Sequence, residues 1–127
     1  MNYVQYDDFK KMDMRFGLIK YIEPVEGTDK LLRFEIDFGA TEGETELPFE
    51  KEEYAGRDVR QIVSGIREFF PGYQSLVGQY GLYILNLEPR EIRGVMSHGM
   101  LMAVDGVDGN PVFLKPSADI EPGAAIR

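Results

Sequence analysis

The sequence predicts an all-β fold, a small five-stranded barrel with one short helix and a C-terminal extension. Two observations lead to this expectation. Short apolar segments with two-residue alternation recur along the chain, and turns rich in glycine and proline separate them. Only the connection at 66–78 interrupts the strands with a helical or irregular pattern. A length of 127 residues fits one domain, so we expect a single domain 1–127 with a core at about 13–105 and an arm at 106–127.

The first elements run from the N-terminus to a strongly alternating strand. Residues 6–12 predict a short helical turn or arm, with Asp7 or Asp8 placed to cap it. A strand at about 14–23 follows, in which Gly17 at a change of face suggests a bulge or a barrel corner. In the next strand, apolar side chains alternate with charged ones over 32–38, and this pattern predicts a half-buried strand.

The strand pattern lapses between residues 39 and 56, where six glutamates surround a single lysine, Lys51. A solvated acidic hairpin or loop explains this composition better than a metal site, because no Asp/Gly spacing resembles a calcium loop.

The remaining elements alternate short strands with turns. The apolar residues of 80–87 occupy both faces, so this strand should lie deep. Two Asp–Gly pairs at 105–109 predict a tight turn, and the prolines and glycine after it predict an extended arm rather than a helix. The other expected strands are 59–64, 100–105 and 112–114.

This order of elements is that of a partly open Greek-key barrel, the oligonucleotide/oligosaccharide-binding (OB) fold, although strand number alone also allows an SH3-like barrel. Ligands of the OB-fold lie across strands two and three, between two loops. In this chain those loops are 23–30 and 88–99, so Lys30 and Arg33 should face one groove together with Arg90, Arg93 and Ser97.

The segment 86–104 carries the most chemistry, since its loop combines guanidinium groups with small polar side chains. Such a loop can offer its arginines to phosphates and its polar groups to sugars or base edges. A solvated surface turn is an equally open reading. Residues 59–104 carry a net charge of +1 against −7 for 1–58, within a total of −8, so an anionic ligand should approach the former.

The composition excludes several classes of protein. With no cysteine, the chain has no disulfide framework and no thiolate metal site. No apolar run approaches the roughly 20 residues that span a bilayer, and the N-terminus lacks the apolar core of a secretory signal. We therefore expect a cytoplasmic protein without membrane contact.

Five stretches in order resemble the tRNA-binding domain that occurs free-standing, in methionyl-tRNA synthetases and in the endothelial monocyte-activating polypeptide group. They are DMRFG (13–17), DKLL (29–32), RQIVSG (60–65), LVG (76–78) and NLEPREIRGVMSHGMLMA (86–103). The resemblance implies a non-catalytic barrel that binds tRNA, serves an aminoacyl-tRNA synthetase and is often a homodimer. It places RNA contacts on Lys30, Asn86, Arg90, Ser97 and Met100, to which the predicted groove adds Arg33 and Arg93.

Other readings remain beside this one. Met100 could pack in the core, and Asn86 could stabilise a turn. Glu88 and Glu91 lie next to the basic loop, so we expect weak, shape-directed binding of tRNA. Resemblance to another branch of the same family implies a dimeric, chaperone-like peptide binder instead. An enzyme is the weakest alternative, because Ser97 and His98 are neighbours in a strand, point to opposite faces and make poor catalytic partners. We therefore expect no catalytic residues, no metal and no cofactor.

Overall fold

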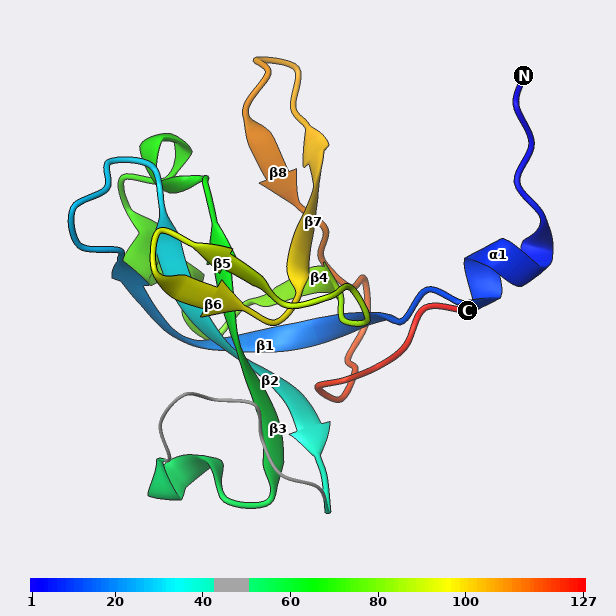
Figure 1. Ribbon diagram of the computed structural model, residues 1–127, viewed down its shortest axis with the longest axis horizontal. Coiled ribbons are helices and arrows are strands. Elements are labelled where there is room, and N and C mark those ends of the chain that lie inside the picture. Colours follow the sequence, from blue (N-terminus) through cyan, green and yellow to red (C-terminus); the bar gives the residue numbers. More distant parts are fainter. Residues whose placement is uncertain (43–50) are drawn as a thin grey trace.

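The computed structural model describes residues 1–42 and 51–127 (Figure 1). Within these residues the protein is mostly β-structure with one short α-helix, α1 (Tyr6–Lys10), which confirms the predicted all-β class. The strands are β1 (Met14–Pro24), β2 (Leu32–Ala40), β3 (Arg57–Ser64), β4 (Tyr80–Ile84), β5 (Arg90–Ile92), β6 (Val95–Ser97), β7 (Met100–Asp105) and β8 (Pro111–Phe113). Three 3-10 helices are η1 (Glu52–Tyr54), η2 (Arg67–Phe69) and η3 (Tyr73–Leu76).

The strands form two antiparallel sheets. Six strands are hydrogen-bonded in the order β3-β2-β1-β4-β7-β8, and β5 pairs with β6 alone. The large sheet curls so that β3 approaches the segment leading into β7, but this seam has no continuous backbone ladder among the described residues. The barrel is therefore not fully closed, as the strand layout predicts.

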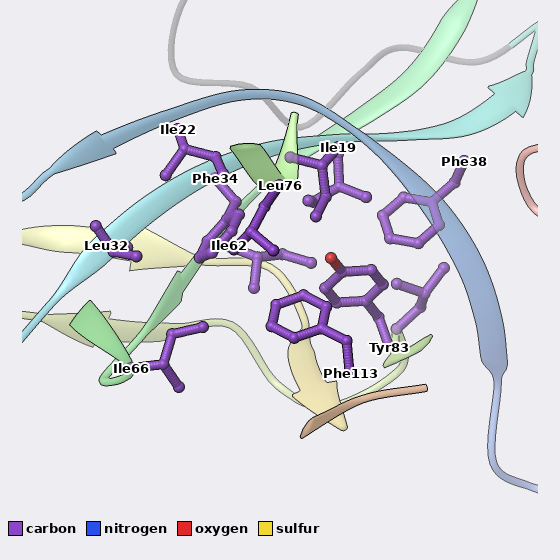
Figure 2. Packing of buried hydrophobic residues seen from close by; sticks show 12 residues of the cluster. Ile19, Ile22, Leu32, Phe34, Phe38, Ile62, Ile66, Leu76, Tyr83 and Phe113 are labelled. Carbon is purple, nitrogen blue, oxygen red and sulfur yellow. The ribbon is translucent and has the colours of Figure 1, made fainter. Parts of the chain in front are cut away.

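The interior of this curled sheet holds the apolar side chains (Figure 2). Phe38 meets Tyr83 edge to face at 5.5 Å between ring centroids, and Phe70 meets Phe113 in the same way at 5.4 Å. Ring pairs of this geometry favour one arrangement of the core over others. Four consecutive residues of β4, 81–84, are buried, so the expectation of a deep strand is confirmed.

Gly17 shapes the barrel by close packing rather than by a bulge. A Cβ at this position would overlap the side chains of Ile36 and Phe38, so only glycine lets β1 approach them. The irregularity in pairing with β2 falls between Ile19 and Tyr21 instead. Of the two alternatives for Gly17, the bulge was wrong in position, and the barrel corner stays a prediction.

The charged face of β2 is covered, and the expectation of a half-buried strand was wrong. Glu35 is fully buried and Asp37 is 6% exposed. Arg57 meets the Asp37 carboxylate through Nε and Nη2, at 2.8 Å for the shorter Nη2–Oδ2 contact. An alternating pattern of apolar and charged residues does not show whether the charged side chains face water or oppositely charged side chains. In β2, Glu35 and Asp37 form ion pairs with Arg33, Lys51 and Arg57 instead of facing solvent.

The two ends of the chain differ in how they join the barrel. In the C-terminal arm, Gly123 N donates to Phe16 O and Phe16 N donates to Ala124 O, so the arm is extended along β1 as expected. Helix α1 has no buried residue and projects from the barrel (Figure 1). Its N-cap is Gln5, without a side-chain hydrogen bond, so capping by Asp7 or Asp8 was a wrong prediction. Residues 43–50 of the predicted acidic hairpin or loop at 39–56 lie outside the described residues.

Candidate nucleic-acid interface

A two-stranded hairpin, β5–β6, forms the centre of the candidate interface. Its turn consists of Arg93 and Gly94, both with positive φ, at 52° and 83°. Two such residues between paired strands make the mirror-image turn that matches the strand twist. We did not predict this hairpin from the sequence, because each strand has only three residues. The pair Arg93–Gly94 between β-branched Ile92 and Val95 was the available signal.

Hydrogen bonds attach the hairpin and the residue after it to β3. His98 N donates to Gln61 O at 2.9 Å, and Gln61 Nε2 donates to Met96 O at 2.8 Å. Ser97 Oγ accepts from Val63 N and donates to Gly99 O, each at 3.0 Å. Ser97, at 4% exposed, thus fixes the hairpin on the barrel, and its bonded hydroxyl faces the protein interior.

The tip of the hairpin meets the loop between β1 and β2, as the predicted groove requires. Arg93 Nη2 donates to Gly27 O at 3.2 Å. The two segments enclose an open pocket of about 440 Å³, and Lys30 and Arg93 both line it. Its other lining residues are Gly27, Thr28, Asp29, Leu31 and Ile92. A concave surface therefore combines two exposed cations and two aliphatic side chains with one carboxylate, that of Asp29.

The register of the hairpin separates its basic and acidic residues. Arg90 lies opposite Ser97, and Glu91 lies opposite Met96. Because neighbours in a strand point to opposite faces, Arg90 shares a face with Ser97, whereas Glu91 is on the outer face. Arg90 is exposed. The carboxylate that follows it in the sequence is therefore directed away from it.

Arg33 lies near the hairpin, but its guanidinium is engaged within the protein. Nε contacts Glu23 Oε1 at 2.7 Å, Nη2 contacts Glu35 Oε2 at 2.9 Å, and Nη1 donates to Gln61 Oε1 at 3.1 Å. The Arg33 side chain is 12% exposed and lies over the Tyr21 ring. The structure thus places Arg33 outside the lining of the two-loop pocket and pairs it with carboxylates.

Glu35 is the buried centre of this network. Lys51 Nζ donates to Glu35 Oε1 at 2.7 Å, and Tyr54 Oη donates to the same oxygen at 2.6 Å. Burial opposes the charged form of the carboxyl, but the hydrogen bonds from Lys51, Tyr54 and Arg33 outweigh it and lower the pKa of Glu35. Burial and the Glu35 carboxylate together raise the pKa of the Tyr54 hydroxyl.

Asn86 and Met100 lie outside the two-loop pocket. Asn86 Oδ1 accepts from Asp13 N at 2.8 Å, and its Nδ2 donates to Lys11 O at 2.5 Å. The amide therefore joins the end of β4 to the segment before β1. Met100 pairs with Ile84 and is 47% exposed, so its side chain is accessible at the start of β7.

The described ranges, 1–42 and 51–127, hold neither a cluster of metal-ligating side chains nor a helix that could span a membrane. They contain no group of three or more His, Asp or Glu side chains placed to hold a metal ion. No helix in them has the length and apolarity needed to cross a bilayer.

Comparison with known proteins identifies the family. A family model described as "Putative tRNA binding domain" matches residues 14–125. The fold is similar to that of a MetRS-related protein from Pyrococcus horikoshii, with a TM-score of 0.78 and 29% identity over the whole of both chains. It is also similar to the chaperone CsaA from Bacillus anthracis, with a TM-score of 0.74 and 23% identity over 99% of this chain and 100% of that one. CsaA from Picrophilus torridus gives the same TM-score at 22% identity, over 98% of this chain and 100% of that one. With a match that spans both loops of the pocket and the hairpin between β4 and β7, the chain belongs to the tRNA-binding domain family.

Proposed function

We propose that this chain is a non-catalytic tRNA-binding module that acts with an aminoacyl-tRNA synthetase, the methionyl enzyme being the first candidate. The observation that carries the proposal is the meeting of Lys30 and Arg93 at one pocket, with Arg90 on the same hairpin as Arg93. These cations come from segments more than 50 residues apart in the chain. Family membership and the likeness to a MetRS-related protein support the role of the pocket.

The pocket suits a folded RNA better than a fixed base sequence. Exposed lysine and arginine side chains recognise phosphates through charge, and RNA is often recognised by shape and backbone. Leu31 and Ile92 offer an apolar surface on which an unstacked base can pack. The net charge of −8 repels polyanions at long range, so we expect weak binding that is useful when a synthetase holds the same tRNA.

A filter-binding titration with tRNA at several salt concentrations tests the proposal. Arg90→Ala should weaken binding and flatten the dependence of log affinity on log salt by about 0.7–0.9, the value for one lost phosphate contact. Lys10→Ala is the matched control, since it removes one exposed positive charge from α1, which projects from the barrel. Absence of tRNA binding by the wild type, or equal behaviour of the two variants, would refute the proposal.

A dimeric, peptide-binding role is the second candidate, and the acidic charge is the observation that favours it. A surface with a net charge of −8 attracts basic polypeptides and repels RNA. This role predicts that an unfolded basic peptide binds under conditions in which tRNA does not. Light scattering at micromolar concentration tests the expected homodimer separately.

A further inference from the structure

We propose that Gln61 is a positioning residue for the RNA-binding hairpin β5–β6, and that Arg33 acts through it instead of contacting phosphate. This inference rests on the proposed function of the hairpin and deepens it. It assigns a role to a buried amide and to an ion-pair network that lie beside the pocket without lining it.

Both polar atoms of the Gln61 amide, Oε1 and Nε2, form hydrogen bonds, and the chemistry of their partners fixes the orientation of the amide. Oε1 accepts from the Arg33 guanidinium, which can only donate. Nε2 donates to Met96 O, which can only accept. The residue is 4% exposed, so water cannot readily replace either partner. Gln61 therefore connects the network around Arg33 to the backbone of β6.

Arg33 is itself held in place. Glu23 contacts Nε at 2.7 Å and Glu35 contacts Nη2 at 2.9 Å, on different nitrogens of one planar group. Glu35 is fully buried and receives two further hydrogen bonds, from Lys51 and Tyr54. A guanidinium fixed at two positions presents its third nitrogen, Nη1, in one direction, toward Gln61.

The hairpin needs such support because it is not part of the six-stranded sheet. A two-stranded hairpin alone is marginally stable in water. The bonds from Gln61 and Ser97 to β3 and the contact of Arg93 with Gly27 set its orientation. A hairpin held in the bound orientation does not need to be ordered when RNA binds, and this preserves affinity.

Gln61→Glu is the most direct test. A carboxylate keeps the acceptor for Arg33 but loses the donor for Met96 O and places an oxygen against that carbonyl. We expect tRNA affinity to fall roughly 3- to 10-fold, the range for one lost buried hydrogen bond, with an unchanged salt slope. Backbone amides of residues 90–97 should exchange hydrogen faster in the free protein. Wild-type affinity together with wild-type exchange would overturn the inference.

Arg33→Lys separates positioning from direct contact with phosphate. Lysine keeps the positive charge, so direct contact predicts affinity close to that of the wild type, whereas positioning predicts a loss like that of Gln61→Glu, because an ammonium cannot hold three partners in one plane. Arg57→Lys is the matched control, since it disturbs the Asp37 ion pair on the same sheet without touching the hairpin. If the wild type does not bind tRNA, the proposed function fails, but hydrogen exchange in the three variants still decides whether Gln61 and Arg33 position the hairpin.

Discussion

Replacement of Glu35 by glutamine should lower the free energy of unfolding by about 3 kcal/mol at neutral pH. The carboxylate is fully buried and interacts with three donors at 2.6–2.9 Å, those of Lys51, Tyr54 and Arg33. Glutamine keeps the shape of the side chain but removes its charge. This weakens the two charge-assisted interactions, with Lys51 and Arg33, which are worth about 1.5–3 kcal/mol each. We take the lower part of the sum, because Lys51 is 31% exposed and can be solvated.

The difference between the wild type and Glu35→Gln should depend on pH. The folded-state pKa of Glu35 is lowered, so its stabilising contribution is complete above the unfolded-state pKa of about 4.3 and is lost as the pH falls through the lower folded-state value. Glutamine does not titrate. The two stability curves should therefore approach each other in acid.

Urea denaturation between pH 3 and pH 8, followed by circular dichroism, measures both effects. In a thermal denaturation the same loss would lower Tm by roughly 11 °C, because the unfolding entropy is about 2.1 cal/mol/K per residue over 127 residues. Glu23→Gln is the control, because that partner of Arg33 is 42% exposed and its pair should contribute under about 1 kcal/mol. A loss below 1 kcal/mol for Glu35→Gln, or a loss independent of pH, would refute this account of the network.

Three other changes test separate features. Tyr83→Phe should raise stability by about 1 kcal/mol in urea denaturation, because the buried hydroxyl finds no hydrogen-bond partner in the described part of the chain; a loss of stability would contradict this. Gly123→Ala should lower the free energy of unfolding by at least about 2 kcal/mol in the same assay, because a φ of 89° is combined with overlap between the new Cβ and Phe38 O. Gly27→Ala is its control and should lower it by only about 1 kcal/mol, because the φ of 77° is similar but the space around the new Cβ is open. Arg93→Gly should leave Tm nearly unchanged, because the strain that glycine relieves at φ of 52° is offset by the lost hydrogen bond to Gly27 O. The same change should weaken tRNA binding, and wild-type affinity would exclude Arg93 from the interface.

The strands could be predicted from the sequence where side-chain alternation is strong. The predicted strand at 100–105 coincides with β7, and the Asp–Gly turn after it is present, with Gly109 at φ of 83°. The coverage of the β2 carboxylates was not predictable, because their partners Lys51 and Arg57 lie 16 and 20 residues further along the chain. Pairing at such separations depends on the fold rather than on local pattern.

The meeting of the two predicted loops could be predicted from the sequence, but the contacts of the individual side chains could not. The loops at 23–30 and 88–99 do meet, and Lys30 and Arg93 share a pocket. Composition could not distinguish Arg93, which is exposed, from Arg33, which is paired with Glu23 and Glu35. The carboxylates that pair with Arg33 are Glu23 in β1 and Glu35 in β2. In the sequence, each of them looks like an ordinary solvent-facing residue of an alternating strand. RNA contact by Lys30, Asn86, Arg90, Arg93, Ser97 and Met100 stays a prediction, whereas for Arg33 we propose a positioning role through Gln61 in place of the predicted contact.

The separation of β5–β6 from the six-stranded sheet has an evolutionary consequence. Substitutions at exposed positions of this hairpin leave every ladder of the barrel intact, so they can alter ligand preference at little risk to folding. A change in ligand specificity can therefore evolve through a few substitutions of surface side chains, while the residues of the barrel stay the same. A mutation of Gln61 in β3 differs from these substitutions, because it would disturb both the barrel and the hairpin that we propose as the RNA-binding element.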